Sequence, residues 1–471
     1  MEANAAKVKK TEIKKIAFLV LSIVVYLGLT SIEPPEGLSI EGWKGIALII
    51  SATITWVTEY VPIAISSCLL LFLPNLLKID STGNIMKNFA TPTLFFILSA
   101  LLIAQAFVKV GFGYRVSLYV TTLFGNKSKY VLLSLMLCTS FISFFLADIP
   151  AGIIVGAIAN EILNKNDCEP GKSIFGKSVM LGIPIAAAVG GVATPAGSGV
   201  NILSINLLKS VAGIEIGFLQ WSIVGVPLAV LLTLISWLVI SKLYKSEFET
   251  IKGFEDIEEE RKALGKMSKD ETIFLIIFGA TIILWLTQSM TNLETAFVSM
   301  LATTLFFLPG IEILEWEEAK QKIGWEILLL VGSCNALAMI LSDHGSAKWL
   351  SDTFLGGFTN SSLLMVIFAV TTFGIFIHLL VPISGAVMAL TIPVIAILAE
   401  TMGVNPIYLV LPLAYTASCV FLIPLDPTAM TTYGYGYWKL KDMPKPGFII
   451  AVFWIPILVA LMYVAINLKL I

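Results

Sequence analysis

Charge is scarce in this sequence of 471 residues. Asp, Glu, Lys and Arg make up 13% of it and hydrophobic residues 57%, whereas a soluble domain is about 25% charged and about 45–50% apolar. The net charge of -2 provides no basic excess for binding nucleic acid. Such a chain, with a mean hydropathy of +0.91, has room for about ten or more membrane helices of roughly 20 residues each. We therefore expect an all-α polytopic protein of the cell membrane.

Histidine and cysteine are also sparse. His344 and His378 are the only histidines, which excludes a histidine-based metal cluster. The five cysteines are odd in number and four of them lie in apolar runs. We predict that they are reduced packing residues and not a disulfide framework. No nucleophile–base pair is visible, so we expect neither an enzyme nor an organic cofactor.

The first apolar run, at about 16–29, follows a cluster of lysines. By the positive-inside rule these lysines place the N-terminus in the cytoplasm. A cleaved signal peptide is the alternative, but Ser31–Pro35 contains no small-x-small cleavage pattern. We therefore predict a retained helix. The lysines are Lys7, Lys9, Lys10, Lys14 and Lys15.

The remaining apolar runs form two groups, separated by the one long hydrophilic stretch, 242–271. Several runs are short and end in Gly, Pro, Ser or Asn, which is typical of re-entrant or broken segments. The first group covers 42–58, 60–77, 93–110, 129–147, 149–163, 179–193 and 219–243. The second group covers 272–290, 295–310, 325–341, 362–381, 383–400, 405–423 and 447–469.

The two groups match each other at a nearly constant separation. Thr194 and Thr428 lie 234 positions apart, as do Asn126 and Asn360. Matches between apolar residues arise by chance, but polar and turn residues that keep one register indicate an internal repeat. Duplicated halves with interrupted helices are typical of secondary transporters, and an odd number of crossings between them would make the repeats inverted. We divide the chain into an N-terminal region with the first helix (1–40), a first repeat (41–243), a charged cytoplasmic linker (244–270) and a second repeat (271–471).

One pair of repeat-related segments, 143–152 and 378–385, places Pro, Gly or Ser between apolar half-helices. Pro frees a backbone carbonyl, and Gly lets the backbone approach a ligand closely. The half-helix after a break offers N–H groups to an anion, and the half before it offers carbonyls to a cation. A structural kink is the alternative, but two breaks in register favour binding.

A second pair, 190–201 and 424–436, is too rich in Gly, Thr, Ser and Pro to face lipid as unpaired backbone. Such segments line a cavity inside a membrane protein. Close helix packing through small residues is the alternative interpretation. We favour a binding site.

Four ionisable residues stand within or beside the apolar runs: Asp148, Asp426, His378 and Glu59. A charge at the bilayer centre costs at least about 2.5–3.5 kcal/mol, so such a residue usually faces a cavity. The two aspartates suit a cation ligand or a proton carrier. We expect Glu59 to be a boundary carboxylate, and leave open whether His378 is a substrate donor or a core residue. No Lys or Arg stands in mid-run, so an anionic substrate would rely on helix N-termini, hydroxyls, amides or co-bound cations.

Four segments carry a family resemblance. The sequence has T-E-x-x-P at Thr58–Pro62, G-G-x-x-T-x-x-G-S-x-x-N at Gly190–Asn201, Trp325 with a Leu-rich run into Gly332, and G-Y-G-Y at Gly434–Tyr437. Over about residues 40–460 the chain resembles the divalent anion:sodium symporter family, the transporters of dicarboxylates, citrate and sulfate. The last motif, with His378 upstream of Ile383, is most similar to the branch of citrate/succinate and 2-oxoglutarate/malate exchangers.

The resemblance implies an elevator-type fold of about eleven transmembrane helices and two re-entrant hairpins, with scaffold and transport domains and a homodimer. It implies a dicarboxylate at the hairpin tips, flanked by sodium ions in the sodium-coupled members. The family's polar tips align here with Ala147–Ile149 and Ile383–Gly385, where four of six positions lack the hydroxyl or amide. Asp148 adds a carboxylate, which requires a cation or proton beside a dianion.

We predict a secondary transporter of a small organic anion, with a C4–C5 dicarboxylate as the first choice, coupled to Na⁺ or H⁺ or working by exchange. Sulfate, a sulfonate or another small acid is the alternative cargo, and a channel is the alternative class. The partners expected are this anion, the lipid bilayer and a second copy of the chain. The predicted substrate-binding residues are Thr194, Pro195, Ser198, Asn201, Ser384, Gly385, Pro427 and Thr428. The residues predicted for the coupling cation or proton are Ser143, Asp148, Gly191, His378 and Asp426.

Overall fold

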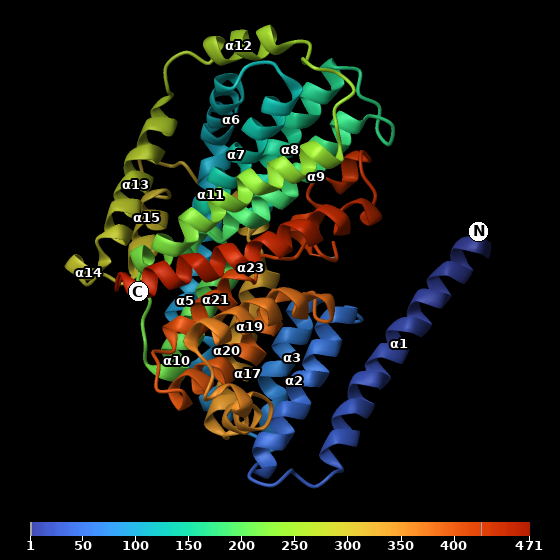
Figure 1. Cartoon of the computed structure of the whole chain (residues 1–471), viewed down its shortest axis with the longest axis vertical. Helices are drawn as coiled ribbons and strands as arrows, with labels where there is room; N and C mark the ends of the chain where they lie inside the picture. The colour runs from blue at the N-terminus through green and yellow to red at the C-terminus, as the bar shows by residue number, and fades with distance from the viewer. Residues whose placement is uncertain (1, 425) are drawn as a thin grey trace.

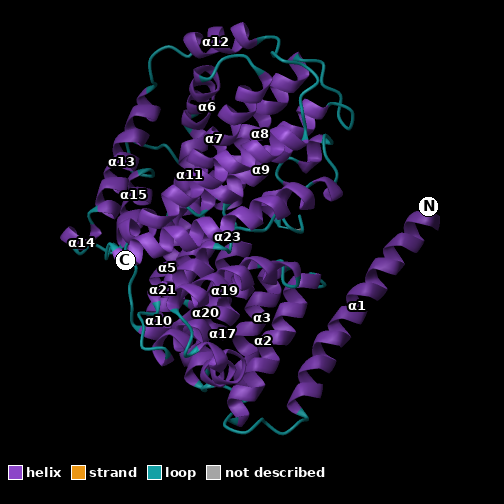
Figure 2. Cartoon of the chain, viewed as in Figure 1, coloured by secondary structure: helices purple, strands orange, loops and turns teal. Residues whose placement is uncertain are grey.

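The structure is a computed structural model that describes residues 2–424 and 426–471, with side chains from residue 12 onward. Within these residues it consists of helices and loops, with no strand beyond one isolated bridge between Lys127 and Thr250 (Figure 2). The prediction of an all-α fold is confirmed.

The helices of the first half lead from the N-terminus to the hydrophilic stretch (Figure 1). They are α1 (Glu2–Thr30), α2 (Ile40–Thr58), α3 (Ile63–Leu76), α4 (Thr82–Phe89), α5 (Pro92–Lys109), α6 (Phe112–Leu123), α7 (Ser128–Leu146), α8 (Asp148–Lys165), α9 (Ile174–Gly191), α10 (Gly199–Ala212) and α11 (Phe218–Leu243).

The hydrophilic stretch and the second half contain the remaining helices. They are α12 (Phe254–Ala263), α13 (Lys269–Leu286), α14 (Gln288–Thr291), α15 (Thr295–Leu305), α16 (Trp316–Lys322), α17 (Trp325–Asp343), α18 (Ser346–Leu350), α19 (Leu363–Phe376), α20 (Ser384–Thr401), α21 (Ile407–Tyr415), α22 (Pro427–Met430) and α23 (Pro444–Asn467). Single turns of 3-10 or π type are η1 (Pro195–Gly197), η2 (Ser351–Leu355), η3 (Gly356–Phe358), η4 (Ile377–Leu379), η5 (Tyr433–Tyr435) and η6 (Leu440–Asp442).

Nine helices in the described part of the chain are long and apolar enough to cross a membrane, and four shorter apolar helices accompany them. Their burial separates the centre of the bundle from its lipid-facing rim. In α9, 89% of the apolar segment is buried inside the protein, whereas in α1 only 6% of the corresponding segment is buried. An apolar helix that the protein leaves uncovered needs lipid as its solvent, so the chain is a multi-pass membrane protein.

Local capping explains where several helices begin and end. Ser39 and Ser173 accept hydrogen bonds from the N–H groups of Gly42 and Gly176 at the starts of α2 and α9. Helix α2 stops where Glu59 adopts a left-handed φ of 46°, and α3 restarts after Pro62, whose fixed φ suits a helix start. The T-E-x-x-P motif is therefore a helix break, and the exposed Glu59 lies at its boundary.

The order of helices recurs in the two halves. Helices α5, α7, α8 and α9 begin 233, 235, 236 and 233 residues before α17, α19, α20 and α21. The last long helices of the halves, α11 and α23, pack against each other. This recurrence matches the register that the polar residues of the sequence follow.

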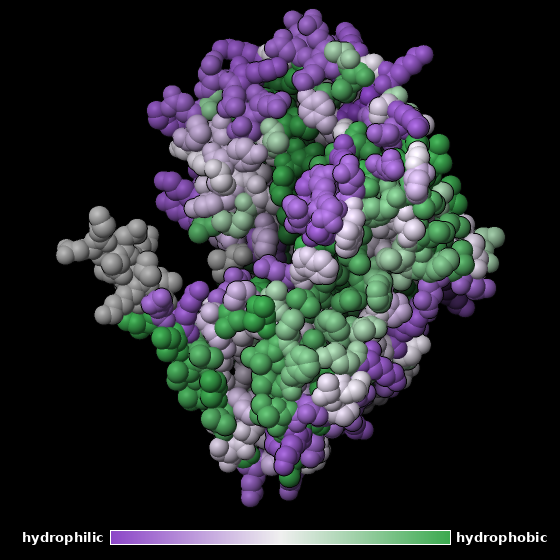
Figure 3. All heavy atoms as spheres, turned by 180° about the vertical axis from the view of Figure 1, so that it is seen from behind, coloured by the Kyte–Doolittle hydropathy of each residue, from purple (hydrophilic) through white to green (hydrophobic). Residues whose placement is uncertain are grey.

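The hydrophilic stretch contains a helix docked on the first half. Ile257 of α12 is buried, and Arg115 of α6 donates to the Gly265 carbonyl at 3.0 Å and to Glu271 Oε1 at 2.8 Å. Figure 3 shows hydrophilic side chains gathered at the end of the molecule that carries α12, and hydrophobic ones over much of the remaining face. The stretch is thus fixed to α6 and covers one polar end of the molecule.

All five cysteines are free and four are buried, as predicted. The lysines near the ends of apolar runs have anionic partners. Lys109 Nζ lies 2.8 Å from Glu318 Oε2, and Lys177 Nζ lies 3.3 Å from Asp442 Oδ2. These side chains reach the polar rim, which is the usual arrangement for lysine at a membrane boundary.

Candidate substrate and cation site

Two broken helices carry most of the predicted site residues. Helix α9 ends at Gly191, the chain makes the single turn η1, and α10 begins at Gly199. In the second half α21 ends at Tyr415, and the short α22 begins at Pro427. Each short turn after a break is capped by the residue before its proline, Thr194 or Asp426. Unwound backbone of this kind is tolerated within a membrane only where it is buried in protein or lines a cavity.

The first hairpin bends at Ala147, between α7 and α8. Ala147 has a φ of 61° and a ψ of 155°, outside the helical region, and α8 starts directly afterwards at Asp148. The Ser143 hydroxyl donates to the Ala187 carbonyl at 2.7 Å. The hairpin tip therefore packs along the last turns of α9, beside the first break.

Close backbone packing joins the hairpin to this break. A Cβ added to Gly197 would lie 2.9 Å from the Ser143 carbonyl oxygen and closer still to that of Gly191. At Gly191 an added Cβ would lie 3.6 Å from both the Asp148 Cβ and the Ser143 Oγ. Gly197 leaves no room for a side chain. This packing brings Ser143, Asp148 and Gly191 together, three of the residues predicted for the cation.

The Asn201 side chain holds the loop of the first break in place. Its amide nitrogen donates to the carbonyls of Gly191 at 2.7 Å and Thr194 at 2.9 Å. Its side-chain oxygen is buried and has no hydrogen-bond partner among the described residues. The Thr194 hydroxyl in turn donates to the Phe144 carbonyl. Asn201 and Thr194 thus fix the loop, and the free amide oxygen is available to a cation.

Asp148 and Asp426 come from different halves and meet at Thr428. The Thr428 N–H donates to Asp426 Oδ1 at 2.8 Å, and the Thr428 hydroxyl lies close to both carboxylates. Within the described residues neither aspartate has a Lys, Arg or His partner. Like charges in a desolvated place oppose each other. The arrangement is suited to a bound cation or a shared proton.

The residues of the second hairpin form a separate group. The Ser384 hydroxyl donates to the Ala417 carbonyl at 2.6 Å, just beyond the end of α21, and Gly385 packs 3.6 Å from the Cys334 sulfur. His378 is buried, and neither of its ring nitrogens has a hydrogen-bond partner among the described residues. No described contact joins these three residues to Asp148.

Two aromatic residues bridge the breaks, and the sequence analysis missed both. Trp221 of α11 donates from its indole nitrogen to the Val192 carbonyl at 2.9 Å. The Tyr415 hydroxyl donates to the Trp221 carbonyl at 2.7 Å, and the ring centroids lie 4.8 Å apart. The signal available was an aromatic residue with a polar atom inside an apolar run, because a buried Tyr or Trp needs a hydrogen-bond partner.

Three predicted substrate residues have other surroundings. Ser198 caps α10 by accepting from the Val200 N–H at 3.4 Å. Pro195 is buried in η1, whereas Pro427 is exposed. The sequence register pairs Thr194 with Thr428, but the residue that plays the capping role of Thr194 is Asp426. Thr194 and Asp426 each precede a proline and accept a hydrogen bond from the N–H two residues onward.

Residues 13–468 match the family described as the sodium:sulfate symporter transmembrane region. This match spans nearly the whole chain. The chain belongs to that family. The broken helices and the hairpin tip described above therefore lie in the family's membrane region.

Curated relatives match over similar lengths. The sodium-dependent dicarboxylate transporter SdcS of Staphylococcus saprophyticus is 27% identical over 98% of this chain and 93% of its own. SdcS of Staphylococcus aureus (strain bovine RF122) is 27% identical over 95% of this chain and 90% of its own.

Two solved transporter structures have a similar fold. The YdaH transporter of Alcanivorax borkumensis aligns with a TM-score of 0.55, at 11% identity, over 84% of this chain and 88% of that one. MtrF of Neisseria gonorrhoeae aligns with a TM-score of 0.57, at 11% identity, over 94% and 97%. These structures support the fold alone.

Proposed function

We propose that this protein is a secondary active transporter that carries a C4–C5 dicarboxylate together with sodium ions across the cell membrane. The proposal rests on family membership and on the names of the SdcS relatives, which are sodium-dependent dicarboxylate transporters. Transport requires no covalent chemistry, so no enzymatic step is part of the proposal.

The observation that carries the proposal is the meeting of Asp148 and Asp426 at Thr428, beside the break between α9 and α10. The break supplies both kinds of ligand group: the unpaired Asn201 side-chain oxygen for a cation, and the N–H groups at the start of α10 for an anion. Transporters with broken helices place substrate and coupling ion at such points. We assign the cation to Asp148, Asp426 and the Asn201 side-chain oxygen, with Ser143 and Gly191 adjacent.

Charge balance favours coupling to a cation over simple exchange. A dicarboxylate carries two negative charges into a region that already holds two carboxylates and has no described Lys, Arg or His partner for them. Bringing these charges together without cations is strongly unfavourable in a medium of low dielectric constant. Sodium ions or protons that enter with the substrate remove this cost.

The substrate in this proposal is held by the groups around the breaks: Thr194, Ser198 and Thr428 from the broken helices, and Ser384 with Gly385 from the second hairpin. These residues form two groups, one at the broken helices and one at the second hairpin. A dicarboxylate has two charged ends, so each group can hold one carboxylate. His378 is a candidate donor within the second group.

Sulfate is the second candidate cargo. The family description names it, and the tip residues Ala147 and Ile149 provide no hydroxyl for a second carboxylate. A compact tetrahedral dianion needs its donors at one place, whereas an extended dicarboxylate needs them at both ends.

Three further features complete the proposal. The lysine-rich start of the chain and the charged linker lie in the cytoplasm, following the positive-inside rule. The two repeats have inverted topology, and part of the protein moves as an elevator against a scaffold. The scaffold forms the interface of a homodimer.

The decisive experiment is uptake of labelled succinate into proteoliposomes under a Na⁺ gradient, under a proton gradient, or with no gradient and unlabelled dicarboxylate inside. We expect Na⁺-driven uptake that unlabelled dicarboxylates inhibit more strongly than sulfate does. Inhibition by sulfate alone would favour the second cargo. Uptake only with internal dicarboxylate would refute coupling and identify an exchanger.

A further inference from the structure

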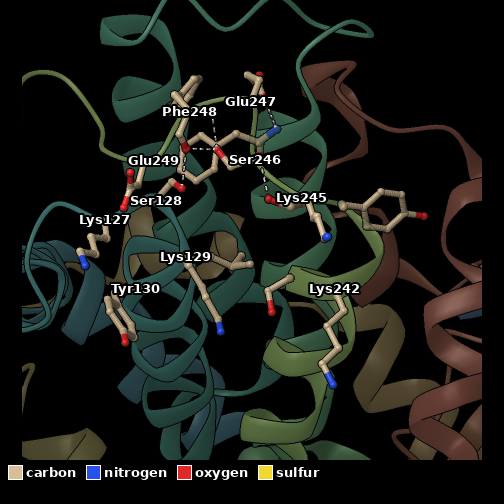
Figure 4. A pocket seen from close by; sticks show the side chains of 15 residues that line it. Lys127, Ser128, Lys129, Tyr130, Lys242, Lys245, Ser246, Glu247, Phe248 and Glu249 are labelled. Carbon is tan, nitrogen blue, oxygen red and sulfur yellow. Dashed lines mark hydrogen bonds between the residues drawn. The ribbon is translucent and has the colours of Figure 1, made fainter.

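A lysine-rich pocket lies away from the transport site, where α7 begins and α11 ends. Its volume is about 630 Å³, and its third wall is the segment 244–249 that follows α11 (Figure 4). Four lysines line it, with two glutamates. The lysines are Lys127, Lys129, Lys242 and Lys245, and the glutamates are Glu247 and Glu249.

The positive charge of this pocket is only partly neutralised by neighbouring side chains. Within the described residues none of the four lysines forms an ion pair. Glu247 is engaged at the start of α9, where it accepts from the Ser173 hydroxyl and, at 2.7 Å, from the Phe175 N–H. Four positive and two negative charges leave a formal charge of +2 on the lining.

Backbone contacts hold the walls in place. Ser128 N–H donates to the Glu249 carbonyl at 2.9 Å, and the Ser128 hydroxyl donates to the Phe248 carbonyl at 2.8 Å. The Trp237 indole of α11 donates to the Lys129 carbonyl of α7 at 2.8 Å. The segment 244–249, α7 and α11 are therefore joined before any ligand arrives, which lowers the entropic cost of binding.

The pocket lies where two candidate membrane spans end, which is the level expected for lipid headgroups. Helices α7 and α11 are both candidate membrane spans, and the pocket lies between their ends. Tyr130 stacks on Trp237 with ring centroids 6.4 Å apart, and Lys129 Nζ lies 4.9 Å from the Trp237 ring centroid. Aromatic side chains gather at this boundary of membrane proteins. Figure 4 shows the ammonium ends of Lys129 and Lys242 pointing in the same direction along the two helices.

We propose that this pocket binds a phosphate group, either on the headgroup of an anionic phospholipid or free in solution. Lysine binds phosphate as a concentrated point charge, and clustered lysines beside membrane spans attract anionic lipids. The site is independent of the transport function proposed above, because it shares no residue with the two breaks.

The test compares two double variants of the purified full-length protein in a neutral detergent. Lys129→Gln with Lys242→Gln removes two charges from the pocket. Lys87→Gln with Lys348→Gln removes two exposed charges that lie outside it and form no described ion pair. The probes are phosphatidylglycerol, phosphatidylcholine and inorganic phosphate, and the readouts are the probe's dissociation constant and the thermal unfolding midpoint.

We expect phosphatidylglycerol to bind the unaltered protein and the control variant, and to bind the pocket variant at least about tenfold more weakly, since two of the charges that attract the anionic headgroup are removed. Phosphatidylcholine, which has no net charge, should bind neither. Equal unfolding midpoints without probe would show that both variants are folded.

The probes also separate the two sources of phosphate. Pocket-dependent binding of phosphatidylglycerol, with no effect of millimolar inorganic phosphate, identifies a lipid site. Pocket-dependent binding of inorganic phosphate alone identifies a soluble phosphate ligand. If both probes bind the pocket variant as tightly as the control variant, or if neither binds the unaltered protein, the proposal is wrong.

Discussion

The two broken helices differ in how firmly their breaks are built. The first break is short and fully buried from Val192 to Gly197, and α10 resumes directly with 14 residues. The second includes Thr416–Pro424 and Asp426, α22 has 4 residues, and no other helix longer than 3 residues follows before α23. Its residues Thr416–Leu422 are buried as well, and the exposed positions Pro427, Tyr433 and Gly434 lie in and after α22.

This difference indicates a division of labour. In the first region a side-chain amide and close backbone packing fix the loop before a ligand arrives. In the second region Asp426 adds a carboxylate, and the neighbouring backbone has room to adjust. We infer that the first break is a rigid platform for substrate and cation, and that the second supplies charge and adapts its shape. A series of substitutions can test this contrast.

The largest effect is expected from adding a methyl group to a glycine in each region. Gly197→Ala places a carbon against the carbonyls of Gly191 and Ser143, so it should destabilise the protein by about 3 kcal/mol or more and abolish transport. Gly434→Ala meets nothing within 4 Å and should leave uptake nearly unchanged. Thermal unfolding and succinate uptake of both variants provide the measurement. Equal tolerance at the two positions would remove the contrast in rigidity.

The next effect concerns charge. Asp148→Asn retains the shape of the side chain and removes one of the two carboxylates, so the variant should fold while its Na⁺ or pH dependence of uptake is lost and cation affinity falls by at least about tenfold. Asp426→Asn keeps an oxygen that can accept from the Thr428 N–H, and should have a similar but smaller effect. Initial uptake rates against Na⁺ concentration and pH test both variants. Unchanged dependence in Asp148→Asn would remove this residue from the mechanism.

A smaller effect is expected from the side chain that closes the first break. Asn201→Ala leaves the Gly191 and Thr194 carbonyls without their amide donor, which should cost roughly 2–4 kcal/mol of unfolding free energy. Thr431→Val in the second region removes one hydrogen bond from a partly exposed hydroxyl and should cost about 1 kcal/mol or less. Chemical or thermal unfolding in detergent compares the two. A larger loss for Thr431→Val would reverse the assignment of the rigid region.

Much of this organisation is visible in the sequence because membrane helices need long apolar runs, and because breaks in them need Gly, Pro or Ser. The T-E-x-x-P break and the bend between Ser143 and Pro150 were predictable on that basis. The pairing of Asp148 with Asp426 was not, since the two residues are 278 positions apart and meet only through packing. Packing also decides that Asp426, and not Thr428, caps its turn in the way that Thr194 caps the first, so the sequence register did not predict this role.

Tyr415 and Trp221 escaped prediction because an aromatic residue in an apolar run gives no sign of which carbonyl its polar atom will reach. Thr194 and Asn201 were predicted to hold substrate, and their hydrogen bonds show that they hold the loop. A motif records which residues a break contains. It does not separate the residues that shape the loop from those that contact a ligand, because the same polar groups do both.

The smallest effect comes from the bridge between the two regions. Tyr415→Phe keeps the ring contact with Trp221 and removes the hydroxyl that donates to its carbonyl, which should cost about 1 kcal/mol. Tyr408→Phe is the matched control in the same helix, since its hydroxyl has no hydrogen bond among the described residues. If the two breaks travel together through the transport cycle, the bond persists throughout, so Tyr415→Phe should lower the unfolding midpoint and leave the uptake rate within about twofold. Clearly faster uptake would instead mean that the bond opens in each cycle, and that the adaptable second break moves relative to the platform.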